Sequence, residues 1–87
     1  MNHIRAHLRM MTNEEVSEFV STLNQDGTTD KYILEDFTGN HRVSARSLIG
    51  AIYMTVDHNN DTYLVNESND GYFPSAIDKF RALAAVD

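Results

Sequence analysis

Apolar and basic side chains alternate strictly from residue 3 to residue 10. The two sets are Ile4, Ala6, Leu8 and Met10 against His3, Arg5, His7 and Arg9. Successive side chains of a β-strand point to opposite faces, so this segment is predicted to be a half-buried strand. Residues 31–37, rich in aromatic and aliphatic side chains, are predicted to form a second strand, the turn at residues 38–40 leads into a short third strand at 41–45, and residues 62–66 form a fourth.

The pattern changes to helical spacing after Met11. Thr12 and Glu15 form the sequence signature of a capping box, in which each side chain accepts a hydrogen bond from the backbone of the other residue. Met11 and Val16 occupy the hydrophobic-staple positions around that cap. Apolar residues then recur at 16, 19, 20 and 23. This pattern predicts a first helix that ends at residues 24–27.

Two shorter helices are predicted further along the chain. Ser47 is a suitable N-cap for a helix over the apolar residues that follow it, although Gly50 makes that helix intrinsically weak. Pro74 suits the first turn of a last helix. The apolar stripe of that last helix comprises Phe73, Ile77, Phe80, Leu83 and Ala84.

The predicted element order is β-α-β-β-α-β-α. Mostly antiparallel strands with the helices collected on one face define an α+β open-faced β-sandwich. A chain of 87 residues is expected to form a single domain over residues 1–87.

Composition excludes several classes of function. The chain has no cysteine, which removes disulfides, thiolate metal sites and cysteine nucleophiles, and fits a cytoplasmic protein. The net charge of −6 disfavours binding to nucleic acid or to anionic membranes. No apolar run is long enough to span a membrane, and residues 1–11 lack the apolar core of a signal peptide. The oligomeric state stays open, because the first strand offers an edge for pairing.

Metal binding and catalysis have little support. His3 and His7 lie about 13 Å apart on a strand that rises roughly 3.3 Å per residue, which is too far for one ion. Asp57, Asn59 and Asp61 resemble the opening of a calcium loop, but the turn glycine and the closing glutamate are absent. No glycine elbow or spacing marks a nucleophile. We therefore expect no metal, no cofactor and no enzymatic activity.

Ser47 is the best candidate for a functional site. A hydroxyl at a helix N-terminus lies where free backbone N–H groups and the helix dipole favour an anion, so a phosphate on Ser47 would be stabilised. Arg46 and Arg42 are close enough in sequence to meet that phosphate, and three aliphatic residues follow it: Leu48, Ile49 and Ile52. The alternative is that Ser47 only caps the helix and that the aliphatic residues belong to the core.

The segment from Arg42 to Gly50 resembles HPr, the histidine-containing phosphocarrier of the bacterial sugar phosphotransferase system. In HPr, too, a short strand leads into a basic residue, a serine, two aliphatic residues and a glycine, and the element order is similar over nearly the whole chain. The resemblance implies an HPr-like fold and a bacterial cytoplasmic setting. It also implies that Ser47 matches the serine that a dedicated kinase phosphorylates, and that Leu48, Ile49 and Ile52 match docking positions.

One departure from HPr bears on function. The phosphoryl-carrying histidine of HPr lies between the first strand and the first helix, within a Gly-x-His-Ala-Arg stretch. Residues 10–15 here contain no histidine, glycine or arginine, and Thr12 falls roughly where that histidine is expected. Glu14 and Glu15 would repel an incoming phosphoryl group.

The leading hypothesis is therefore a non-enzymatic docking and regulatory module of the HPr type, without histidine phosphotransfer. Its working surface comprises Arg46, Ser47, Leu48, Ile49 and Ile52, with Arg42 as a supporting charge. Its partners would be proteins of the phosphotransferase system or of transcriptional regulation. The alternatives are a phosphocarrier that uses His7 or His41, and a small metal- or ligand-binding domain.

Overall fold

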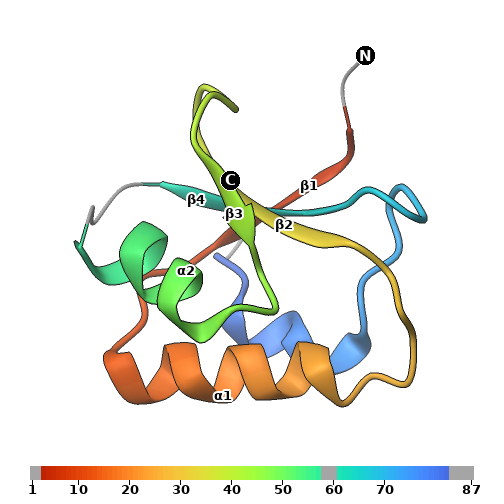
Figure 1. Cartoon of the computed structure of the whole chain (residues 1–87), viewed down its shortest axis with the longest axis horizontal. Coiled ribbons are helices and arrows are strands. Elements are labelled where there is room, and N and C mark those ends of the chain that lie inside the picture. The colour runs from red at the N-terminus through yellow and green to blue at the C-terminus, as the bar shows by residue number, and fades with distance from the viewer. Residues whose placement is uncertain (1–2, 58–60, 83–87) are drawn as a thin grey trace, which may run out of the picture.

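Four antiparallel strands form one sheet in the computed structural model, which describes residues 3–57 and 61–82. The strand order is β1-β4-β2-β3, so β4 and β2 lie in the centre (Figure 1). The bounds are β1 Arg5–Leu8, β2 Tyr32–Asp36, β3 Arg42–Ser44 and β4 Thr62–Asn66. All four predicted strands are confirmed, and the first three are shorter than the patterns indicated.

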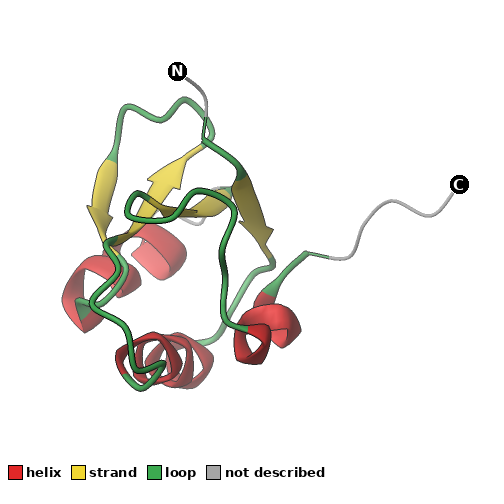
Figure 2. Cartoon of the chain, turned by 90° about the vertical axis from the view of Figure 1, so that its right-hand side faces the viewer, coloured by secondary structure: helices red, strands yellow, loops and turns green. Residues whose placement is uncertain are grey.

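The helices lie on one face of this sheet and leave the other face open (Figure 2). They are α1 Asn13–Asn24, α2 Leu48–Ile52, the π-helix η1 Tyr53–Asp57 and the 3-10 helix η2 Ser75–Phe80. This arrangement confirms the α+β class. No helix in the described part of the chain is both long and apolar enough to cross a lipid bilayer.

The start of α1 follows the sequence signature. The Thr12 hydroxyl accepts a hydrogen bond from the Glu15 amide at 3.2 Å, and the Glu15 carboxylate accepts one from the Thr12 amide at 3.0 Å. Two of the four N–H groups that a helix start leaves unpaired are thereby satisfied. The predicted apolar stripe of α1 is buried: Val16, Phe19, Val20 and Leu23.

The core lies between the sheet and the helices. The inward-facing residues of β1, β2 and β4 include Ala6, Leu8, Leu34 and Leu64, all of them buried. Phe80 of η2 meets Phe19 of α1 edge-to-face, with ring centroids 5.4 Å apart. This contact connects the last helix to the first. An edge-to-face pair of aromatic rings stabilises the fold by more than the apolar area that it buries.

The predicted last α-helix is wrong in type and extent. Residues 75–80 form a 3-10 helix, and Pro74 precedes it as the N-cap instead of lying in its first turn. The chain then becomes extended, because the Arg9 amide donates to the Phe80 carbonyl at 2.9 Å and the Ala82 amide donates to the His7 carbonyl at 2.8 Å. This pairing along the outer edge of β1 competes with helix formation. Leu83 and Ala84 lie outside the described residues.

Candidate functional site

Ser47 lies at the junction between the end of β3 and the start of α2. Its backbone is extended, and its side-chain oxygen accepts a hydrogen bond from the Gly50 amide at 3.2 Å. The Ser47 carbonyl accepts the first helical hydrogen bond, from the Ala51 amide at 2.9 Å. Ser47 is therefore the N-cap of α2, as predicted, and it is exposed at the surface.

The aliphatic residues after Ser47 divide between the surface and the core. Ile49 is 83% exposed and Leu48 is 42% exposed. Ile52 is half-buried and packs against the core, while Ala51 is fully buried. α2 thus anchors its inner side beneath the sheet and presents two large aliphatic side chains outward. The alternative that all three aliphatic residues belong to the core fails for Leu48 and Ile49.

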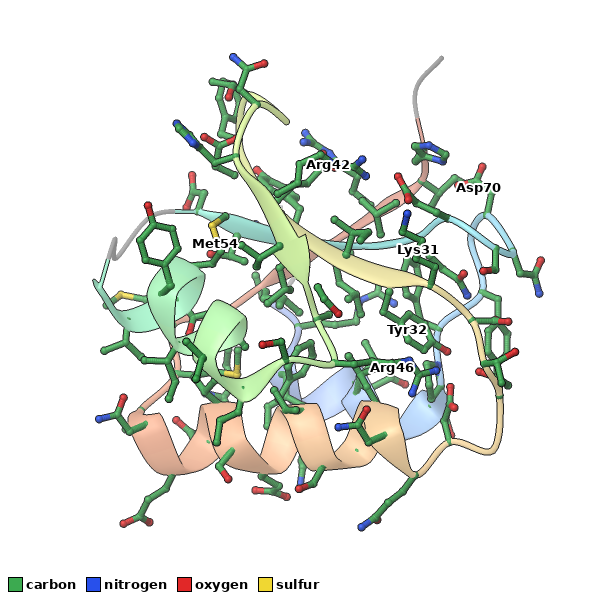
Figure 3. The ribbon with its side chains drawn as sticks, viewed as in Figure 1. Lys31, Tyr32, Arg42, Arg46, Met54 and Asp70 are labelled. Atoms are coloured by element: carbon green, nitrogen blue, oxygen red, sulfur yellow. The ribbon has the colours of Figure 1, made fainter. Side chains whose placement is uncertain are left out.

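The side chain of Arg46 is half-buried and binds backbone carbonyl groups of the protein itself. Its guanidinium donates to three carbonyl oxygens, those of Leu23 at 2.6 Å, Asp30 at 3.0 Å and Thr28 at 3.1 Å. It also lies over the ring of Tyr32, at 4.9 Å from the centroid (Figure 3). These contacts tie the α2 junction to the end of α1 and to residues 28–30.

Arg42 lies on the opposite side of the sheet from Arg46 (Figure 3). It contacts Glu35 at 3.1 Å and Glu67 at 2.6 Å. The hydrogen bond from Arg42 lowers the pKa of the Glu67 carboxyl. The structure therefore brings together Ser47, Leu48 and Ile49, and it separates Arg42 from them.

Thr12 holds the position that the resemblance gives to a phosphohistidine. Its amide and its hydroxyl are engaged in the capping box, and its carbonyl accepts a hydrogen bond from the Val16 amide at 2.9 Å. Arg9 donates to the Glu15 carboxylate at 2.8 Å, and this hydrogen bond, with that from the Thr12 amide, lowers the pKa of Glu15 to about 2. Glu15 is therefore ionised above about pH 2, and its carboxylate is paired with Arg9 at the start of α1.

The two histidines considered for phosphotransfer lie elsewhere. His7 stacks on Tyr63 with ring centroids 4.6 Å apart, and its Nε2 lies 3.4 Å from an Asp61 carboxylate oxygen. His41 is exposed in the loop between β2 and β3. Neither residue lies at a helix N-terminus, where backbone N–H groups would stabilise a phosphate.

The metal hypothesis gains no support. Within residues 3–57 and 61–82, no group of three or more His, Cys, Asp or Glu side chains is arranged to hold an ion. His3 contacts Asp70 at 3.6 Å, whereas His7 contacts Asp61, so the two histidines have different partners. Asn59, the middle residue of the calcium-like pattern, lies outside the described residues.

The open face of the sheet carries an ion-pair network that the sequence interpretation missed. Glu35 is buried, and its carboxylate accepts hydrogen bonds from Arg5 and Arg42, each at 3.1 Å. Ile33 and Val65 lie in the same row of this face as Arg5, and both are buried. An open groove of about 690 Å³ adjoins the network. Its lining comprises His3, Arg5, Glu35, Phe37, Thr38, Gly39 and Arg42.

A signal for this network was present in the sequence. Arg5 and Arg42 lie at outward-facing positions of two predicted strands, and a glutamate interrupts the apolar run of a third. In the sheet, Arg42 lies opposite Glu35 in the β2–β3 pair, and Arg5 reaches Glu35 from β1 across the intervening β4. The positive charges of Arg5 and Arg42 are therefore paired with carboxylates on this face.

Comparison with known proteins identifies no relative. No protein-family model matches the chain, no curated protein matches it, and no solved structure matches it.

Proposed function

We propose that the chain is an HPr-like docking and regulatory module of the bacterial cytoplasm, without histidine phosphotransfer. It binds protein partners through Leu48 and Ile49 of α2 and accepts a regulatory phosphate on Ser47. The partners belong to the phosphotransferase system or to transcriptional regulation. The resemblance of residues 42–50 to HPr supports this assignment, together with the antiparallel sheet whose helices lie on one face.

The observation that carries the proposal is the exposure of Ile49 and Leu48 directly after an exposed serine. An aliphatic side chain with 83% of its surface in water, as at Ile49, gains nothing for folding from its apolar character. A second large aliphatic residue beside it makes an apolar patch of the kind that protein partners cover. Ser47 is close enough for a phosphate there to change the binding of such a partner.

The start of α1 supports the absence of phosphotransfer. The Glu15 carboxylate, which Arg9 keeps ionised down to low pH, already accepts the hydrogen bond of the Thr12 amide, so this N–H group is not free to hold a phosphoryl group. Thr12 also lacks the imidazole nitrogen that carries the phosphoryl group in HPr.

The first experiment separates docking from phosphotransfer. The chain is incubated with phosphoenolpyruvate and the general phosphotransferase enzyme, beside an HPr control, and its intact mass is measured before and after acid treatment. We expect no acid-labile phosphate. Acid-labile phosphate that disappears in His7→Ala or His41→Ala would overturn the proposal in favour of a phosphocarrier.

The second experiment tests the regulatory site. With ATP and the kinase that phosphorylates HPr on serine, we expect one acid-stable phosphate on the wild-type chain and none on Ser47→Ala. Ile49→Glu should raise the KM of the kinase for the chain by roughly tenfold, the effect of losing about 1.4 kcal/mol of docking energy. Phe37→Glu is the matched control, because Phe37 is 68% exposed on the hairpin between β2 and β3. No phosphate on the wild-type chain, or equal effects of the two glutamates, would count against this site.

A further inference from the structure

The helix that begins at Leu48 changes type before it ends. Residues 48–52 are α-helical, and residues 53–57 continue them as the π-helix η1. An α-helix pairs each amide with the carbonyl four residues back, whereas a π-helix pairs it with the carbonyl five residues back. Because π-turns are rare and occur frequently at functional sites, the cause and the consequence of this one bear on function.

A buried hydroxyl accounts for the π-turn. Thr55 is 8% exposed, and its hydroxyl donates to the Ala51 carbonyl at 2.7 Å. In a continued α-helix, that carbonyl would accept a hydrogen bond from the Thr55 amide. A hydroxyl that is shielded from water needs an acceptor within the protein, so it takes the Ala51 carbonyl in place of the backbone amide.

The same type of bond in α1 has no such effect. The Thr22 hydroxyl donates to the Glu18 carbonyl at 2.9 Å, yet α1 stays α-helical as far as Asn24. Thr22 is exposed, so water can replace this bond at little cost. Burial of the hydroxyl is therefore the feature that distinguishes Thr55 from Thr22.

The π-turn keeps Val56 away from the exposed apolar side chains of α2. In an α-helix, residues 49, 53 and 56 lie on one face, at spacings of four and three. Ile49 is 83% exposed and Tyr53 is 46% exposed, whereas Val56 packs against the core. The wider π-turn explains the difference, because it rotates each residue by less than an α-helix does and so turns Val56 inward. The buried Ala51 and Met54 are three apart and share one face of an α-helix as well.

We propose that residues 48–57 form a switch between two helical registers, which hides Val56 in the π form and exposes it beside Ile49 and Tyr53 in the α form. Thr55 holds the π form through its bond to the Ala51 carbonyl. The use of the switch rests on the docking function proposed above: a partner that covers Ile49 gains Val56 as a further apolar contact only in the α form. Such a partner shifts the population towards that form, because a ligand favours the state that it binds more tightly.

Single cysteines report the register, because the chain has no cysteine of its own. The test measures how fast a small maleimide labels Val56→Cys in the free chain, with Thr55 and with Thr55→Val. Valine has the shape of threonine without the hydroxyl, so the Ala51 carbonyl is left to the backbone amide and the helix tightens. We expect labelling to become several-fold faster with Thr55→Val, and to stay slow with Thr55→Ser, which keeps the hydroxyl.

Three controls separate a change of register from other causes. Ile49→Cys, at a position that is exposed in both forms, should label equally fast with and without Thr55→Val. Val20→Cys lies in α1 at a position that is 5% exposed, so it reports unfolding of the whole domain and should stay slow in both backgrounds. Thr22→Val should leave the labelling of Val56→Cys unchanged.

NMR couplings across hydrogen bonds identify the register directly. The Asp57 amide should couple to the carbonyl of Ile52 in the wild-type chain and to that of Tyr53 in Thr55→Val. An Asp57 amide that keeps its Ile52 partner in Thr55→Val would overturn the proposal, whatever the labelling rate. Equal labelling rates of Val56→Cys with Thr55→Val and with Thr55→Ser would overturn it as well.

The switch and the docking function can fail separately. Labelling and NMR use the free chain, without kinase or partner, so a single register can be found in a chain that is still phosphorylated on Ser47. Conversely, a chain that takes up no phosphate on Ser47 can still show both registers in the same two measurements.

Discussion

The guanidinium of Arg46 donates to the carbonyl oxygen of Leu23 at 2.6 Å, so a side chain from the β3–α2 junction closes the C-terminal end of α1. The last turn of α1 contains no basic residue of its own. Carbonyl groups at a helix C-terminus lack backbone partners and carry the negative end of the helix dipole. A cation from another part of the chain supplies both the missing donor and the missing charge.

Arg46→Ala should lower the free energy of unfolding by about 2–3 kcal/mol, because three carbonyl oxygens lose a charged donor. Urea unfolding followed by circular dichroism measures the loss. Arg81→Ala is the control, since Arg81 lies 4.0 Å from Asp78 at an exposed site and an exposed pair contributes at most about 1 kcal/mol. Equal losses for the two variants would contradict a stabilising role for Arg46.

Thr12→Ala should lower the free energy of unfolding by about 1 kcal/mol, the usual cost of removing an N-cap side chain. The Glu15 amide loses its acceptor in this variant. Thr12→Ser keeps a hydroxyl at the same position and should retain most of the stability. The same urea experiment compares the two variants, and the prediction fails if serine and alanine are equally destabilising.

Glu15 should make the fold sensitive to acid. Its pKa is lowered from 4.5 to about 2 in the folded chain, first by the hydrogen bond from Arg9 and then by that from the Thr12 amide. A carboxyl whose folded pKa is depressed contributes stability above its unfolded pKa and loses that contribution as the pH falls towards the folded pKa. Stability should therefore fall from about pH 4.5 to about pH 2.

Urea midpoints measured across that pH range check this prediction. Glu15→Gln should reduce the dependence on pH without removing it, because the pKa values of Asp26 and Glu67 are lowered as well. A wild-type midpoint that stays constant down to pH 2, or an unchanged slope in Glu15→Gln, would show that the Arg9–Glu15 pair does not stabilise the fold.

Gly50 allows α2 to approach β3 closely. A Cβ atom at this position would lie 3.2 Å from the Cβ of Val43. Gly→Ala inside a helix normally stabilises by about 0.5–1 kcal/mol, and we expect the clash to cancel that gain in Gly50→Ala. When Val43→Ala removes the branched side chain, adding Gly50→Ala should recover part of the gain. Thermal unfolding of the four combinations gives the coupling, and simple additivity would contradict the close contact.

Features that depend on neighbouring residues could be predicted from the sequence. The spacing of Thr12 and Glu15 predicts a capping box, and both hydrogen bonds are present. Ser47 before an aliphatic run predicts an N-cap, and residues 62–66 form the strand that their pattern indicates. The two caps are made within three residues of chain, whereas residues 62–66 were predicted from their pattern although their pairing partners, β1 and β2, are distant in the sequence.

The errors arise where a distant segment decides the outcome. Residues 80–82 pair with β1, more than 70 positions earlier in the chain, and this pairing ends the last helix at Phe80. Arg42 and Arg46 appear equivalent near Ser47 in the sequence. The partners that separate them, Glu35 and Glu67 for Arg42 and Leu23 for Arg46, belong to other elements. Only the assembled sheet shows that the two arginines lie on opposite sides of it.

The pairing of β1 also constrains when the domain can fold during its synthesis. β1 is synthesised before the other strands, but its neighbour in the sheet is β4, and its outer edge is paired with residues 80–82. The hairpin of β2 and β3 can form early, because its strands are close in sequence. β1 can pair only after residues 62–66 and 80–82 have been synthesised, so the nascent chain carries an unpaired, half-apolar strand while the residues between them are added.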